Sequence, residues 1–275
     1  MHRHTSEQAQ ISFDQLRYIR QVKKELCKIH FLRWFFFLLF LIMWEVAAGQ
    51  EWINSFIFCS PSKIFHCFID MLLHQSLARH IGITVYETLI GFILVVVISI
   101  LIAMILWWNE TVSKVTEPYL VVLNSLPKSA LAPVLIVWLG ASMQTIIVCA
   151  ISVAIFGSIL NIYTCFQTVD PDKIKLIKTL KGSKLDILRL VIIPSSIPNM
   201  ISVMKVNIGL SLVGVVIGEF LAAKAGLGYL IIYGSQTFKL SWVLMSIVLL
   251  CILAMLLYQA IRLIENHLGR YCQDT

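Results

Sequence analysis

The sequence predicts an all-α, polytopic membrane protein with six transmembrane helices. Two compositional features support this prediction: 59% of the 275 residues are hydrophobic, and only 13% are charged. A soluble domain carries about 25% charged residues, so this chain has too few to cover a water-exposed surface. The third observation is a series of apolar stretches of about 20 residues, the length that crosses a bilayer. The polar segments between them are too short for a large soluble domain.

The first half of the chain supplies the first two expected spans. A polar leader, residues 1–30, precedes a run that is apolar apart from Arg33 near its start and Glu45 near its end. Residues 88–109 contain no Asp, Glu, Lys or Arg, and the span they predict extends back to residue 83. Both runs are long enough to cross the hydrocarbon core as helices.

The remaining four spans follow from three further runs. Residues 129–169 are free of charged side chains but too long for one helix, and the segment LGASMQ, 139–144, divides them into two. The stretch 195–223 holds only two charged residues, and 240–261 holds none. The expected spans are therefore 31–48, 83–108, 118–139, 145–163, 195–223 and 240–262, within a transmembrane domain of residues 31–268 that is followed by a short tail, 269–275.

The positions of lysine and arginine predict the orientation, because cytoplasmic loops carry an excess of both. Sixteen of them lie in the leader with Arg33 at the start of the first span, in the loop after the second span, in the segment between spans four and five, and in the tail with Arg262 at the end of the last span. Only four lie on the alternate side. Both termini are therefore expected in the cytoplasm, as an even number of spans requires.

The segment between spans four and five, 168–194, predicts two short helices outside the bilayer. Asp170 can cap the first helix, and Pro171 suits its first position. Gly182 is expected to interrupt the helices, and Ser183 with Asp186 forms a capping box for the second. Pro194 is expected to begin the next span.

Residues of this segment form two neighbouring stripes. Ile174, Ile177 and Leu180 form an apolar stripe, and lysines at 175, 178 and 181 form a basic one. Two interpretations fit this pattern. The helix could lie on the membrane surface with its lysines near anionic headgroups. Alternatively, its apolar ridge could enter a groove of a cytoplasmic partner while the lysines fix the register.

Three embedded charges, Lys128, Lys205 and Glu219, are candidates for the translocation pathway, because charges inside spans are costly. Lys205 and Glu219 lie about 21 Å apart along one helix and cannot pair with each other. Each also has a structural alternative: Lys205 could extend to the headgroups, and Glu219 could be a hydrogen-bonded acid near the interface. Lys128, between two prolines, is expected at a helix break, where an anionic substrate would suit it. Glycines at 209, 214 and 218 predict close helix packing or a smooth pore wall.

Several function classes are excluded by the sequence. Most of the net charge of +7 lies beside the predicted spans, which argues against nucleic-acid binding. The seven cysteines form no CxxC pair, so no metal site is expected. No HExxH or GxSxG motif is present, so no catalytic residues are expected. The chain also lacks the Gly-x-x-x-x-Gly-Lys-Ser/Thr loop that holds ATP phosphates.

Four ordered motifs across roughly residues 30–268 resemble the permeases of ABC importers, and most closely the group that serves sulfonates, taurine, nitrate and vitamin precursors. They are TLKGS with VIIPSSIP (179–183 and 191–198), SLPKSALAPVLIVWLG (125–140), VGVVIGEFLAAKAGLGYLI (213–231) and SPSKIF (60–65). One departure from the family pattern is that Lys175 stands where the Glu of the Glu-Ala-Ala signature is usual.

The resemblance implies a set of partners for the chain. A cytoplasmic ATPase dimer would bind the coupling segment and the ATP-Mg, so that this chain needs no cofactor of its own. A second permease, as a homodimer, and an extracytoplasmic solute-binding protein would complete the importer in the lipid bilayer. The residues expected to couple to the ATPase are Asp170, Ile174, Lys175, Ile177, Lys178, Leu180, Lys181, Gly182, Ser183 and Pro194.

The substrate implied by the resemblance is a small organic or inorganic anion, such as a sulfonate or nitrate, with vitamin precursors left open. The competing hypothesis is a self-contained secondary transporter. Such a transporter would show paired embedded charges or an inverted repeat, and the sequence shows no visible repeat.

Overall fold

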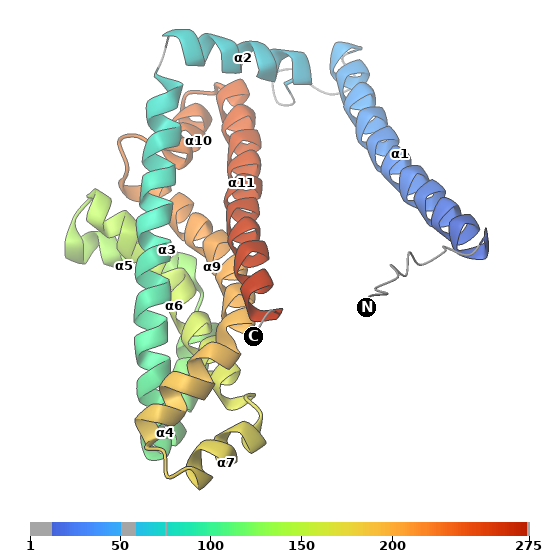
Figure 1. Cartoon of the computed structure of the whole chain (residues 1–275). Helices are drawn as coiled ribbons and strands as arrows, with labels where there is room; N and C mark the ends of the chain where they lie inside the picture. The colour runs from blue at the N-terminus through green and yellow to red at the C-terminus, as the bar shows by residue number, and fades with distance from the viewer. Residues whose placement is uncertain (1–12, 51–58, 75, 274–275) are drawn as a thin grey trace. The chain divides into compact units, whose positions relative to one another are not determined.

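The computed structural model describes residues 13–50, 59–74 and 76–273. It divides into two compact units, Met1–Lys63 and Ile64–Thr275. The described residues are almost entirely helical, as the composition predicts. Figure 1 shows the order of the helices along the chain, coloured from blue to red.

The first unit consists mainly of α1, Phe13–Gly49, a continuous helix of 37 residues. It contains the expected span 31–48, and the expected end of the leader at residue 30 lies inside the helix. Near its end, the Glu45 carboxylate accepts hydrogen bonds from the backbone N–H of Ser62 at 3.1 Å and from the Ser62 hydroxyl at 2.5 Å. Glu45, a charge in the first expected span, is thus bound to a neighbouring segment of the same unit.

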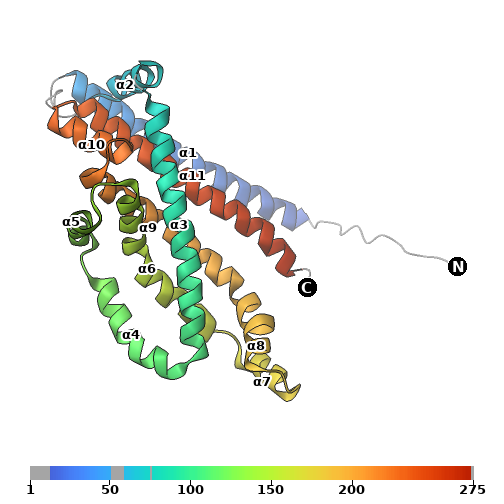
Figure 2. The same cartoon turned by 90° about the vertical axis from the view of Figure 1, so that its left-hand side faces the viewer.

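The second unit contains the other helices. Their bounds are α2 Pro61–His74, α3 Leu77–Trp108, α4 Glu110–Ser125, α5 Lys128–Leu139, α6 Met143–Gln167, α7 Pro171–Thr179, α8 Lys184–Ile187, the π-helical turn η1 Leu188–Ile192, α9 Ile193–Ala222, α10 Leu227–Gln236 and α11 Leu240–Gln273, where α2 begins within the first unit. Both views place α7 at one end of the second unit and α10 at the other (Figures 1 and 2). We call these the α7 end and the α10 end.

Among the described residues, five helices are long and apolar enough to cross a membrane, and a sixth span arises if one bent pair is counted. Five of the expected spans therefore correspond to single candidate spans. The fifth expected span begins earlier than predicted, because the helix is continuous from α8 through η1 into α9, Lys184–Ala222. Pro194 accordingly lies inside this helical segment and does not begin it.

The third expected span, 118–139, is corrected by the structure. It is built from α4 and α5, which meet at an angle of 93°. The break falls at Leu126, whose ψ of 141° is extended, directly before Pro127. A proline disfavours the α region for the residue before it and offers no N–H to continue the helix. The third expected span is thus broken at Pro127, just before the charge-free run begins and where Lys128 was expected to mark a helix break.

Helix α6 packs closely between α3 and α9 in the second unit, and glycines make this possible. A Cβ at Gly214 of α9 would lie 2.6 Å from the Ala150 Cα, and one at Gly91 of α3 would lie 2.9 Å from the Ala150 Cβ. A Cβ at Gly218 would lie 3.0 Å from the Ile146 Cα. Of the two roles expected for the glycines of α9, the structure therefore assigns close packing to 214 and 218. Gly209 is exposed and has no neighbour within 4 Å of such a Cβ.

Candidate functional site

The segment between α6 and α9 folds as its capping residues predict. The Asp170 side chain caps α7 by accepting a hydrogen bond from the Asp172 backbone N–H at 2.8 Å, and Pro171 occupies the first turn. Ser183 and Asp186 form the predicted capping box of α8: the Ser183 N–H donates to Asp186 Oδ2 at 2.8 Å, and the Asp186 N–H donates to Ser183 Oγ at 3.2 Å. These local hydrogen bonds fix where each short helix begins.

The turn between α7 and α8 differs in detail from the expectation. Lys181, and not Gly182, adopts the left-handed conformation, with φ of 59°. The Gly182 N–H donates to the Ile177 carbonyl at 2.9 Å and the Lys181 N–H to the Lys178 carbonyl at 3.0 Å, which is the Schellman pattern. A Cβ on Gly182 would lie 2.5 Å from Ile177 Cγ2. The absence of a side chain at Gly182 therefore allows the turn to approach Ile177 of α7 closely.

The expected apolar stripe of α7 is divided by the structure between two faces. Ile174 and Ile177 are half-buried and pack against the core cluster that includes Ile162 and Phe166. Leu180 points outward and is 71% exposed, and Leu176, which sequence analysis did not select for the apolar stripe, is 60% exposed. The apolar surface that α7 offers to a partner therefore consists of Leu176 and Leu180.

The lysines of the segment have different surroundings. Lys175 pairs with Asp172 at 2.9 Å, but both side chains are exposed, so the pair contributes little to stability. The Lys184 ammonium group donates to the Trp108 carbonyl and lies 5.8 Å and 5.5 Å from the ring centres of Trp107 and Trp108. Lys184 thus ties α8 to the end of α3 through a charge-assisted hydrogen bond and cation–π contacts.

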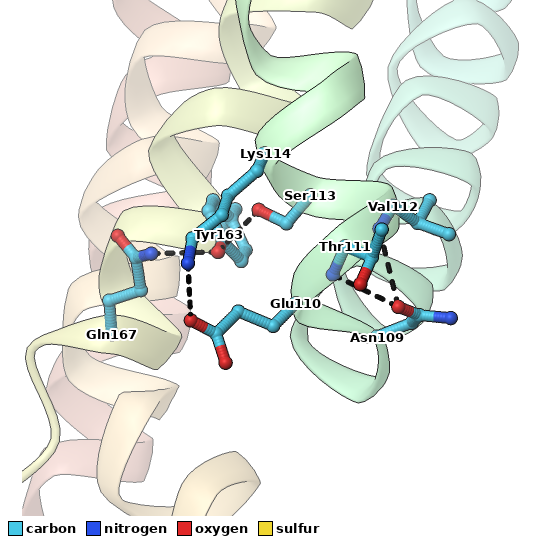
Figure 3. A network of polar contacts seen from close by, with 8 residues as sticks. All are labelled: Asn109, Glu110, Thr111, Val112, Ser113, Lys114, Tyr163 and Gln167. Atoms are coloured by element: carbon cyan, nitrogen blue, oxygen red, sulfur yellow. Dashed lines mark hydrogen bonds and ion pairs between the residues drawn. The ribbon is translucent and has the colours of Figure 1, made fainter.

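A cavity of about 570 Å³ lies at the α7 end, and polar contacts hold its wall in place. Tyr163 of α6 accepts a hydrogen bond from Ser113 of α4 at 2.5 Å and one from Gln167 at 2.7 Å (Figure 3). Asn109 caps α4 by accepting hydrogen bonds from two backbone N–H groups, at 3.0 Å and 3.3 Å. The cavity is lined by Leu106, Trp107, Glu110, Tyr163, Ile174, Lys178, Gly182, Lys184 and Ile187.

The three embedded charges are placed separately. Lys128 begins α5 at the helix break, as expected, and donates a hydrogen bond to Asn124 Oδ1 at 3.1 Å across the bend. Asn124 in turn faces Gly157 of α6, where a Cβ would lie 3.1 Å from the same oxygen. Lys128 is half-buried. Its ammonium group is thus positioned at the break between α4 and α5.

Lys205 of α9 forms an ion pair with Glu265 of α11 at 2.5 Å. The Lys205 side chain is 17% exposed and the Glu265 side chain 31%. The two residues are distant in the sequence, and no local spacing indicated the pair. This contact offers a structural role for Lys205, which was expected to contact either substrate or headgroups.

Glu219 is 1% exposed and accepts hydrogen bonds from the Thr84 hydroxyl at 2.7 Å and the Gly228 N–H at 2.6 Å. The Thr84 hydroxyl oxygen also accepts a hydrogen bond from the Leu227 N–H at 2.8 Å. The carboxyl group of Glu219 therefore attaches the turn between α9 and α10 to α3. The glycine at 226 has φ of 126°, and a Cβ there would lie 2.2 Å from Glu219 Oε1.

Glu87, which the sequence-based expectations did not include, is a further acidic residue inside an expected span; it is 2% exposed and shares a hydrogen bond with the Glu219 carboxyl. It lies inside the expected span 83–108, but beside the charge-free run 88–109. The simple signal that would have found it is an acidic residue within the bounds of a predicted span.

The family described as "binding-protein-dependent transport system inner membrane component" matches residues 95–269, more than half of the chain. The chain belongs to this family. One relative of the permease is the formylaminopyrimidine transport permease protein ThiX of Halalkalibacterium halodurans. The two are 29% identical over 84% of this chain and 92% of that one. The permease is 23% identical, over 84% of both chains, to the putative aliphatic sulfonates transport permease protein SsuC of Bacillus subtilis.

Another relative of the permease is the riboflavin transport system permease protein RibX of Chloroflexus aurantiacus, with 24% identity over 85% of this chain and 87% of that one. Among solved structures, an inward-facing form of the MetNI methionine ABC transporter matches with a TM-score of 0.63 and 19% identity, covering 70% of this chain and 95% of that one. The permease therefore has the fold of an ABC transporter membrane subunit and is an ABC importer permease, as the motifs predicted. It is an inner membrane component with several membrane-spanning helices, and its family is one of transporter subunits and not of enzymes.

Proposed function

We propose that two copies of this permease form the pathway of an importer that is driven by a separate cytoplasmic ATPase dimer and supplied by an extracytoplasmic solute-binding protein. In this arrangement both termini and α7 are cytoplasmic, and the α10 end faces outward. The ATPase dimer binds the ATP-Mg, and this chain holds no cofactor. The excess of lysine and arginine in the leader, the α7 segment and the tail supports this orientation.

One observation carries the coupling proposal: α7 presents exposed Leu176 and Leu180 on one side and packs Ile174 and Ile177 against the core on the other. A helix that enters a partner's groove needs an outward apolar ridge and a rigid attachment to the body it moves. The half-buried isoleucines supply that attachment. ATP-driven movement of the partner would then displace α7 together with α6 and α9, which flank the segment.

The test is recovery of a cytoplasmic ATPase with the tagged chain in a gentle detergent. We expect one ATPase per permease for the unmodified chain and less than about a tenth of that for Leu176→Glu/Leu180→Glu, because two buried apolar contacts of about 1.5 kcal/mol each would be lost. The matched control is Leu185→Glu, the same substitution at a 55% exposed leucine of α8. Full recovery with the double variant would contradict docking through this ridge.

The competing secondary-transporter hypothesis makes the opposite prediction in the same preparation. A chain that purifies without an ATPase, and transports solute alone in liposomes, would overturn the proposal that a separate ATPase drives it.

A further inference from the structure

A second cavity, of about 300 Å³, lies at the α10 end of the second unit, away from α7. It is bounded by α3, by the turn between α5 and α6, and by the segment between α9 and α10. Most of its wall is apolar or small, as in other pockets for small molecules. Its lining includes Ile83, Glu87, Ser142, Met143, Ile146 and Lys224.

Glu87 lines this cavity and carries a buried acceptor atom that none of the described residues satisfies. The residue is 2% exposed, and its Oε2 accepts no hydrogen bond from any described residue. The rest of the Glu87 carboxyl contacts that of Glu219, which is already bound by Thr84 and the Gly228 N–H. A buried polar atom without a partner is costly, and nearly all such atoms in native proteins have one.

We propose that this cavity is a selective entrance site for small solutes that carry N–H donor groups, with Glu87 Oε2 as the acceptor. The inference rests on the proposed function, because the orientation given there makes the α10 end the outer mouth of the pathway. When the Glu87 side chain turns toward the cavity, an amine, amide or amidine N–H of the solute donates to this acceptor and satisfies it.

The same geometry disfavours anions at this cavity. An anionic group would approach two adjacent carboxyl groups, Glu87 and Glu219, in surroundings of low dielectric. The cation that lines the cavity is Lys224, whose side chain is exposed to solvent and is therefore a weak compensation. Lys128, the residue considered for anions, does not line this cavity. The entrance site thus favours a different chemical class from the sulfonate or nitrate implied by the resemblance.

The test uses three probes of matched shape: benzamidine and benzamide, which carry N–H donors, and benzoate, an anion that carries none. Binding to the full-length permease in nanodiscs is measured by saturation-transfer NMR. We expect both donor probes to bind at least tenfold more tightly than benzoate, which corresponds to about 1.4 kcal/mol. Equal or tighter binding of benzoate would overturn the proposal.

Two variants locate the site. Glu87→Leu removes the acceptor, and Ala223→Trp fills the cavity from its wall without altering either carboxyl group. Both should reduce donor-probe binding at least tenfold, while Glu110→Gln, which changes an exposed acid at the α7 end, should leave it unchanged. Gel filtration selects folded samples, and Glu87→Met, which also lacks an acceptor oxygen, provides a second variant if Glu87→Leu does not fold. Unchanged donor binding in the folded Glu87 and Ala223 variants would refute the site.

Failure here is distinguishable from failure of the proposed function. Probe binding is measured without ATP or ATPase, whereas the importer proposal is tested by ATPase recovery. A permease that recovers its ATPase but does not prefer donor probes would refute the entrance site alone.

Discussion

The embedded side chains Lys128, Lys205 and Glu219 have polar partners, most of which lie far away in the sequence. Lys128 is held by Asn124, Lys205 by Glu265, and Glu219 by Thr84 and a backbone N–H. An ion pair or hydrogen bond lowers the cost of placing a charge within the membrane. A charge inside a predicted span therefore identifies an unusual position without showing that it contacts solute.

The Lys205–Glu265 pair can be tested by a double-mutant cycle. Lys205→Met leaves Glu265 without its partner at a largely buried position, and we expect a loss of about 1–3 kcal/mol in stability. Lys205→Met/Glu265→Met should regain most of that loss and also the transport activity. Thermal unfolding and uptake are measured on the same four proteins. Stability that recovers without activity would instead show that Lys205 contacts the solute.

Two glycines of α9 provide a matched pair of substitutions. Gly214→Ala should destabilise the permease by about 1–3 kcal/mol, because its Cβ would lie 2.6 Å from the Ala150 Cα. Gly209→Ala, in the same helix, meets no atom of another described element within 4 Å and should be neutral or stabilising by up to about 1 kcal/mol. Thermal unfolding in detergent compares the two. A Gly209→Ala variant that loses more stability than Gly214→Ala would contradict the packing described here.

At the scale of the helices, the sequence predicts the residues that cap each helix. It does not predict which side of a helix faces the core. The Asp170 cap and the Ser183–Asp186 capping box depend on residues two or three positions apart, so local sequence determines them. Which side of α7 faces the core depends on α6, whose position is a matter of tertiary packing. This is why Ile177 was expected beside Leu180 on an outward ridge but is half-buried.

The turn after α7 predicts opposite effects at neighbouring positions. Lys181→Gly should stabilise the segment by about 1 kcal/mol, because glycine adopts positive φ without the penalty that lysine bears. Gly182→Ala should destabilise it by at least as much, since its Cβ would collide with Ile177. Hydrogen exchange of the α7 amides should slow about fivefold in the first variant and accelerate in the second. Faster exchange in Lys181→Gly would contradict this account of the turn.

Two prolines illustrate why helix breaks are difficult to predict from hydropathy. Pro127 separates α4 from α5 at 93°, whereas Pro194 lies in a continuous helical segment directly after the π-helical turn η1. Proline has no backbone N–H, so one carbonyl group of the preceding turn lacks its usual donor. A π-helical turn is wider than an α-helical one and accommodates both this carbonyl group and the proline ring. Charge-free runs therefore predicted where the candidate spans lie, but not the angle of 93° between α4 and α5.

At the scale of the whole chain, charge distribution predicts orientation, because the sequence itself carries that signal. Accessibility to a membrane-impermeant maleimide tests it, in a background without the seven native cysteines. We expect His74→Cys to react in intact cells and Lys173→Cys to react only after permeabilisation. Both positions are exposed, so packing does not limit the reaction. The reverse pattern would invert the proposed topology.

The close contact of α6 with α3 and α9 limits how the permease can change shape. Ala150 of α6 lies against both Gly91 and Gly214, so a movement that brought a larger side chain opposite Ala150 would force atoms together. Of the two general modes of motion, we expect rotation of the three helices as one body and not shear between them. If a partner displaces α7, we therefore expect α3, α6 and α9 to turn together, so that the displacement is transmitted from the α7 end to the α10 end of the second unit.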